Sequence, residues 1–165
     1  MIRRVVGMTL GAAAILCAAV APAGAQLLEH KDLSLATALA IATAAADHCK
    51  AQGFTVSVAV VGRNAEVIVH LRGDGAPPHS MENSYRRAYT ARTYKQPSGA
   101  VEQRVRKDPG DQLVHLHNVM AAQGGLPVVV GGDVIGAVAV SGSPDGDKDE
   151  ACAKAGLDKV ASVLR

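Results

Sequence analysis

The stretch GGLPVVVGGDVIGAVAVSG, residues 124–142, constrains the fold more than any other part of the sequence. Six of its nineteen residues are glycines, which raises the question of a phosphate-binding loop. Such loops lie between a strand and the helix that follows it. Here Gly131 and Gly132 instead separate two valine-rich segments, and paired glycines supply the positive φ angles of a tight hairpin turn. The stretch therefore predicts a β-hairpin formed by residues 126–131 and 133–142.

The rest of the chain alternates strand-like and helical patterns. Valine-rich segments predict strands over residues 54–62 and 66–72, and a fifth, short strand is expected near Val119. Gly136 lies inside a predicted strand, where glycine often marks a bulge or a close approach of two backbones. Apolar spacing and capping residues predict helices over residues 33–52, from Ser80 to near Lys95, from Ser98 to near Lys107, and over residues 146–164.

The N-terminus has the three parts of a secretory signal. It has a positively charged start, an apolar run over residues 5–20, and small residues that end at Ala25. The apolar run is shorter than the roughly 20 residues that a membrane-spanning helix needs. We therefore expect residues 1–25 to be a cleaved signal, residues 26–165 to form a single domain, and the product to be periplasmic or extracellular.

The charge balance argues against a nucleic-acid partner. The chain has 17 Lys and Arg against 15 Asp and Glu, and loss of Arg3 and Arg4 with the signal leaves it formally neutral. It contains one Phe and no Trp. A protein that binds nucleic acid needs a basic surface, often with stacking aromatic side chains. We therefore expect no nucleic-acid partner.

Two cysteines, Cys49 and Cys152, remain after cleavage at Ala25. An even number of cysteines in an exported protein favours a disulfide, because that compartment is oxidising. Two separate buried thiols are the alternative. The choice depends on whether the two helices that carry the cysteines pack together.

Two blocks of sequence resemble the GlcG/HbpS-like haem-binding family, whose domain is also called haem-degrading. One block is the glycine-rich stretch followed by DEACAKAGL, and the other is LRGDGAPPHSMENSYRRAYTAR at residues 71–92. The match extends from Leu33 to Leu164. The resemblance implies a profilin-like α+β fold with an antiparallel five-stranded sheet and flanking helices. It also implies a homo-oligomer, and haem as the ligand. In the family's fold the first and last helices lie side by side, which favours a disulfide between Cys49 and Cys152.

His48 is the strongest candidate for a ligand of haem iron among the six histidines. It shares one apolar face of the first helix with Ile41 and Ala44, while Leu35 and Leu39 belong to the other apolar face. A helix that is apolar on two sides usually buries both. An apolar platform with one imidazole suits haem, whereas an oligomer interface is the alternative for the same face.

Other candidate ligand residues lie in three places. His115 and His117 would point the same way on an extended segment and could hold a divalent ion with a third ligand, although a solvated loop is the alternative. His79 lies beside the loop of residues 72–76. Arg86 and Arg87 could pair with haem propionates or a small acid, or else form a charged outer face.

The sequence predicts an exported haem-binding protein that acts as a haem carrier, buffer or sensor accessory, with a possible membrane sensor or receptor as partner. One alternative is an enzyme that degrades haem or acts on a small hydroxy acid. Another is a non-catalytic partner of a membrane receptor. Ser141 does not lie in the G-x-S-x-G pattern of a hydrolase, and no other nucleophile stands out, so enzymatic activity is left open.

Overall fold

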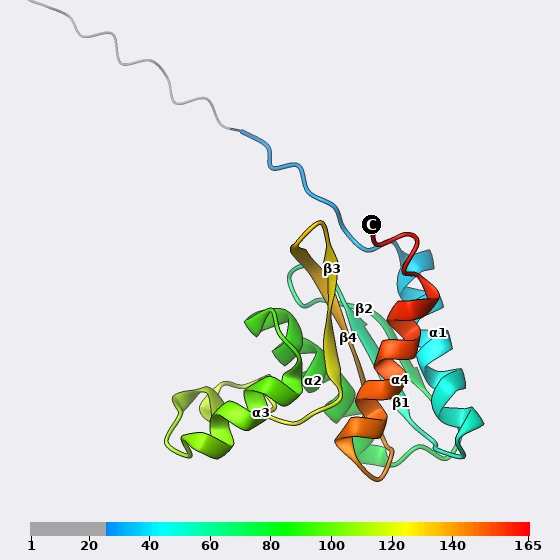
Figure 1. Cartoon of the computed structure of the whole chain (residues 1–165), viewed down its shortest axis with the longest axis vertical. Helices are drawn as coiled ribbons and strands as arrows, with labels where there is room; N and C mark the ends of the chain where they lie inside the picture. Colours follow the sequence, from blue (N-terminus) through cyan, green and yellow to red (C-terminus); the bar gives the residue numbers. More distant parts are fainter. Residues whose placement is uncertain (1–25) are drawn as a thin grey trace, which may run out of the picture.

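In this computed structural model, residues 26–165 are described, and they form four α-helices, one 3-10 helix and four β-strands (Figure 1). The predicted secretory signal, residues 1–25, lies outside the described residues. Within residues 26–165, no helix combines the length and the apolar character needed to cross a bilayer. The elements in chain order are α1 (Leu35–Ala51), β1 (Ser57–Val61), β2 (Val67–Arg72), α2 (Pro78–Tyr94), α3 (Ser98–Lys107), η1 (Gln112–His115), β3 (Gly125–Val130), β4 (Asp133–Ser141) and α4 (Gly146–Lys159).

The strands form one antiparallel sheet in the order β2-β1-β4-β3. The hairpin predicted from the glycine-rich stretch is confirmed as β3 and β4. Gly131 and Gly132 form its turn with φ angles of 58° and 85°. The close approach predicted at Gly136 is also confirmed, because a Cβ atom there would overlap the carbonyl oxygen of Val61 in β1. The glycines of this stretch therefore shape a hairpin and its packing.

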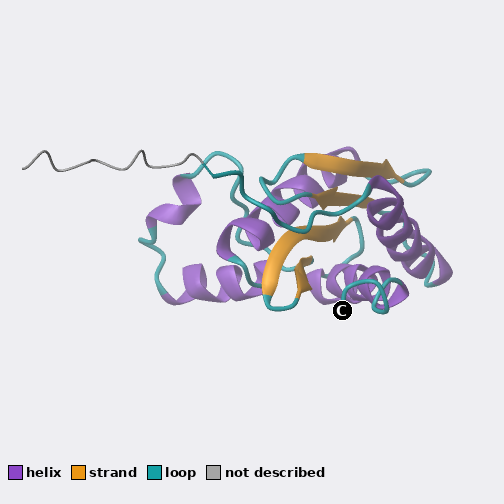
Figure 2. Ribbon diagram, turned by 90° about the horizontal axis from the view of Figure 1, so that it is seen from above, coloured by secondary structure: helices purple, strands orange, loops and turns teal. Residues whose placement is uncertain are grey.

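Helices cover both faces of the sheet. α1 and α4 lie side by side on one face, and α2 packs on the other (Figure 1). Figure 2 shows the strands from above with helices on both sides. Alternate residues of β1 point to opposite faces of the sheet. Val58 and Val60 belong to the apolar cluster with α1 and α4, whereas Ala59 and Val61 belong to the cluster with α2. This two-sided burial explains why every residue of β1 is buried.

The prediction of a fifth strand near Val119 is wrong. This part of the chain forms η1 and then turns, and Val119 is buried in an apolar cluster with Leu113. The Val119 carbonyl accepts a hydrogen bond from Nη2 of Arg86 at 3.0 Å, and the next N–H, of Met120, donates to Oγ1 of Thr90 at 2.8 Å. Side chains of α2 satisfy this backbone in place of a neighbouring strand. The fold is therefore α+β with a four-stranded sheet.

α1 and α4 are in direct contact along their length. Cys49 and Cys152 form a disulfide between them, with the two Cα atoms 5.6 Å apart. One turn further along α4, a Cβ atom at Gly156 would lie 2.6 Å from the carbonyl oxygen of Ile41 and 3.2 Å from Cβ of Ala45. The missing side chain at Gly156 thus lets the two helices approach closely.

Candidate functional site

An open groove runs along the outer face of α1 and is bounded by α4. Its volume is about 790 Å³. Small side chains make up most of its wall, and Lys159 contributes an ammonium group from α4. His48 and Asp47 lie near the C-terminal end of α1. The residues that line the groove are Ala36, Leu39, Ala40, Thr43, Ala44, Asp47 and His48 of α1 with Ala155 and Lys159 of α4.

The faces of α1 differ from the prediction. Ile41 was expected on the same apolar face as His48, but Ile41 is completely buried in the core whereas His48 is exposed. Leu35 and Leu39 are 64% and 47% exposed, although they were placed on the other apolar face of a helix that was expected to bury both faces. The cause is the docking of α4 at Gly156, which covers the side of α1 that carries Ile41. The outer side, with Leu39 and several alanines, remains open as the groove.

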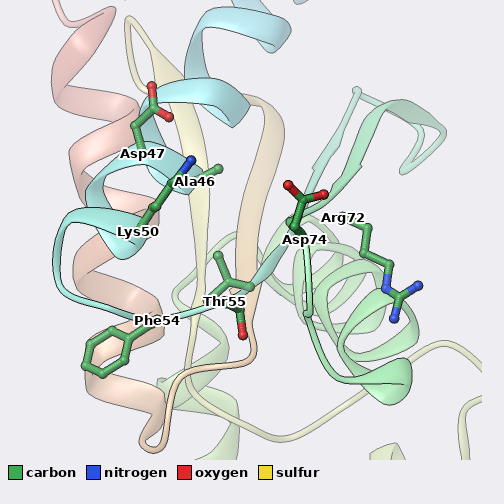
Figure 3. Close-up of a pocket in the computed structure, with 9 residues that line it drawn as sticks. Ala46, Asp47, Lys50, Phe54, Thr55, Arg72 and Asp74 are labelled. Atoms are coloured by element: carbon green, nitrogen blue, oxygen red, sulfur yellow. The ribbon is translucent and has the colours of Figure 1, made fainter.

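A second and smaller hollow lies between the end of α1, the start of β1 and the loop after β2 (Figure 3). Its volume is about 280 Å³, and Asp47 lines both hollows. Lys50 and Asp74 add charges of opposite sign. Figure 3 shows the Arg72 side chain pointing away from the others, and its guanidinium donates to the carbonyl oxygen of Ala76 at 2.7 Å. No histidine is among the residues that line this hollow.

The other predicted histidines lie outside both hollows. His79 is exposed in the first turn of α2. His115 ends η1 and His117 lies in the turn that follows, so the segment is not extended as expected, and both side chains are exposed. Within residues 26–165, no group of three or more His, Cys, Asp or Glu side chains is placed to hold a metal ion.

Arg86 and Arg87 both form hydrogen bonds and ion pairs with other residues of this chain. Arg87 Nη1 lies 2.7 Å from Oδ2 of Asp149 and donates to the carbonyl oxygen of Val140 at 2.9 Å. The Arg87 and Asp149 side chains are 13% and 2% exposed, so this ion pair is buried between α2, β4 and α4. Arg86 donates to the carbonyl of Val119 and contacts Glu82 on its own helix. Neither arginine lines the groove.

His70 of β2, which the sequence does not single out, has a well-defined environment. Its Nε2 lies 3.0 Å from the carbonyl oxygen of Met81 and 3.1 Å from Oγ of Ser84. Burial is the main cause that lowers the pKa of His70 below its ordinary 6.5, and the hydrogen bond with Met81 partly opposes it. Because its imidazole is held by α2 on the other side of the sheet, His70 does not line the groove.

Comparison with known proteins places the chain in a family. The family model described as haem degrading protein HbpS-like matches residues 33–158. A Citrobacter freundii protein, described as an uncharacterized 15.0 kDa protein in the dhaT-dhaS intergenic region, is 31% identical over 137 residues, which cover 78% of this chain and 96% of that protein.

Solved structures agree with this match. A crystal structure of HbpS gives a TM-score of 0.78 and 37% identity over 88% of this chain and 99% of that chain. A double mutant of Streptomyces reticuli HbpS gives a TM-score of 0.77. The PduOC:heme complex shares the fold, with a TM-score of 0.70 and 22% identity over 77% of this chain and 94% of that chain. The predicted resemblance is confirmed, and the chain belongs to the HbpS-like family, whose model carries the description haem degrading protein HbpS-like.

Proposed function

We propose that this protein binds haem in the groove between α1 and α4. The observation that carries the proposal is that an exposed imidazole, His48, lines a wide groove with a mostly aliphatic wall. This donor set fits haem: histidine is a common axial ligand of haem iron, and alanine side chains offer a flat apolar surface to a porphyrin. The HbpS-like family description, which refers to haem, supports the same ligand.

The other candidate positions suit haem less well. The hollow in Figure 3 is smaller, carries charges of both signs and has no histidine in its lining. Arg87 is committed to a buried ion pair with Asp149, so propionate binding there would have to break that pair. His79, His115 and His117 are exposed but line neither the groove nor the hollow.

The proposed role is that of an exported haem carrier, buffer or sensor accessory in the periplasm or outside the cell. In this proposal residues 1–25 direct export, and residues 26–165 work as a single profilin-like domain in a homo-oligomer. A membrane sensor or receptor is the proposed protein partner. The buried disulfide between Cys49 and Cys152 supports an oxidising compartment, because disulfides persist there.

Haem degradation is the second candidate, and the family description favours it. Bound haem would supply the iron for such chemistry, while His48 would hold it in the groove. The two functions differ in one measurable respect. A degrading enzyme consumes haem when a reductant and oxygen are added, whereas a carrier returns the haem unchanged.

A titration of the mature protein with hemin, followed by visible absorbance, tests haem binding. We expect a sharp Soret band that saturates at a fixed ratio of haem to subunit. His48→Ala is expected to abolish the spectrum of histidine-ligated haem, because the iron loses its nitrogen ligand. His79→Ala is the matched control, since His79 is an exposed histidine outside the groove, and it should leave the spectrum unchanged. A broad response without saturation, like that of free hemin, would exclude the proposed function.

A further inference from the structure

Lys159 provides the groove with a positive charge. On the same helix, Nζ of Lys154 lies 2.6 Å from Asp158, and Nζ of Lys148 lies 3.1 Å from Asp145. Lys159 takes part in no ion pair within residues 26–165, although its neighbour Asp158 is a carboxylate. Because Asp158 already pairs with Lys154, the ammonium of Lys159 is available to an anionic group that enters the groove.

The packing of the two helices places Lys159 and His48 at different levels of the groove. Gly156 rests between Ile41 and Ala45, and the disulfide joins the two helices one turn away, so α4 runs antiparallel to α1. Lys159 lies three residues beyond Gly156, toward the N-terminal end of α1, while His48 lies near the C-terminal end. At 1.5 Å per residue, their levels differ by about 12 Å along the helix axis. One extended, flat ligand can therefore contact both side chains.

The charges in the groove are arranged asymmetrically. Asp47 lies beside His48 and takes part in no ion pair within the described part of the chain, so this end carries a free carboxylate. Asp47 would repel the carboxylates of a ligand, whereas Lys159 at the other end would attract them. The surface between the two charges is formed mainly by the side chains of Ala40, Thr43 and Ala44. This pattern suits a ligand that has an apolar body and carboxylates on one edge.

We infer that Lys159 is the specificity-determining residue of the groove and that it recognises the carboxylates of a dicarboxylic porphyrin. The inference rests on the proposed haem site and identifies the carboxylates as the part of the ligand that Lys159 recognises. A carboxylate paired with an ammonium at the edge of an apolar macrocycle is shielded from water on one side, which strengthens the pair relative to a fully exposed one. Since Lys159 contacts the edge of the ligand and not its centre, this recognition does not require iron. The groove therefore binds metal-free porphyrins that carry free carboxylates.

Fluorescence titration with metal-free protoporphyrin IX and with its dimethyl ester tests the inference. The two probes share the macrocycle, and only the first carries charged carboxylates. We expect Lys159→Gln to weaken protoporphyrin binding on the order of five- to tenfold, as loss of one charge-assisted hydrogen bond implies, and to leave ester binding unchanged. Lys159→Arg should retain the affinity, because it keeps the charge. Lys154→Gln is the control, since Lys154 lies on the same helix but outside the groove lining.

The outcomes separate this inference from the proposed function. Suppose that hemin binding saturates and depends on His48, but that the Lys159→Gln variant binds protoporphyrin IX and its dimethyl ester as the wild type does. The inference about Lys159 is then wrong, and the proposed haem site stands. If the wild type binds the ester as tightly as the acid, or binds neither, the inference is also wrong. If hemin fails to saturate, the haem proposal fails, even if protoporphyrin binding depends on Lys159.

Discussion

Cys49 of α1 and Cys152 of α4 are both completely buried and are joined by a disulfide at the point where the two helices cover the sheet. The two residues are 103 positions apart in the sequence, so the bond closes most of the described chain into one loop. A loop of this length removes much conformational freedom from the unfolded chain. The chain-entropy model puts the stabilisation at roughly 4 to 5 kcal/mol, as an upper value.

We therefore predict that Cys49→Ala/Cys152→Ala lowers the free energy of unfolding by about 2–4 kcal/mol. Urea denaturation followed by circular dichroism measures this difference. The wild type unfolded with a reductant present should have a midpoint close to that of the double variant in the same buffer. An unchanged midpoint in the double variant would show that the bond does not constrain the unfolded chain.

The ion pair between Arg87 and Asp149 gives a second prediction. Arg87→Ala leaves the Asp149 carboxylate buried with one remaining donor among residues 26–165, the N–H of Ser143, so we expect the free energy of unfolding to fall by about 3–5 kcal/mol. The control is Arg106→Ala, because Arg106 is 75% exposed in its pair with Glu102, and a loss of at most about 1 kcal/mol is expected. Urea denaturation of both variants checks the contrast, and equal losses would contradict it.

The local features of the fold were predictable from the sequence, and the features that depend on docking were not. The hairpin at Gly131 and Gly132 follows from a short pattern of glycine between apolar segments, so the prediction was correct. The strand expected near Val119 was wrong, because side chains of α2 take the hydrogen bonds that a neighbouring strand would supply. An apolar segment does not reveal which partner satisfies its backbone.

In the candidate site too, the residue that local sequence indicates was predicted, and the residue that depends on helix docking was not. His48 was identified from the sequence because its residue type and its position on an apolar helix face both suit a ligand. Lys159 was missed, although it lies four residues after Ala155 and therefore on the same helix face. That spacing does not indicate which face of α4 borders α1. Only the close contact of Gly156 with α1 reveals that Lys159 and His48 line one groove.

His70 gives a prediction for the pH dependence of stability. Burial lowers the pKa of His70 in the folded protein below the value of 6.5 expected when the chain is unfolded, so the unfolded state binds a proton more readily. The contribution of the neutral His70 imidazole to the free energy of unfolding is therefore fully present above pH 6.5. It is lost as the pH falls through the lower pKa of the folded protein. We therefore expect the urea concentration at the unfolding midpoint of the wild type to decrease when the pH is lowered from 7.5 to 5.5.

His70→Gln is the matched variant, because a glutamine amide can still donate to the carbonyl oxygen of Met81 but does not titrate. The fall in midpoint between the two pH values should be smaller in this variant than in the wild type. A proton NMR titration of the wild type provides the direct measurement, with the His70 signal assigned by its absence from the variant. A midpoint for that signal at or above pH 6.5 would show that burial by α2 does not disfavour the charged imidazole.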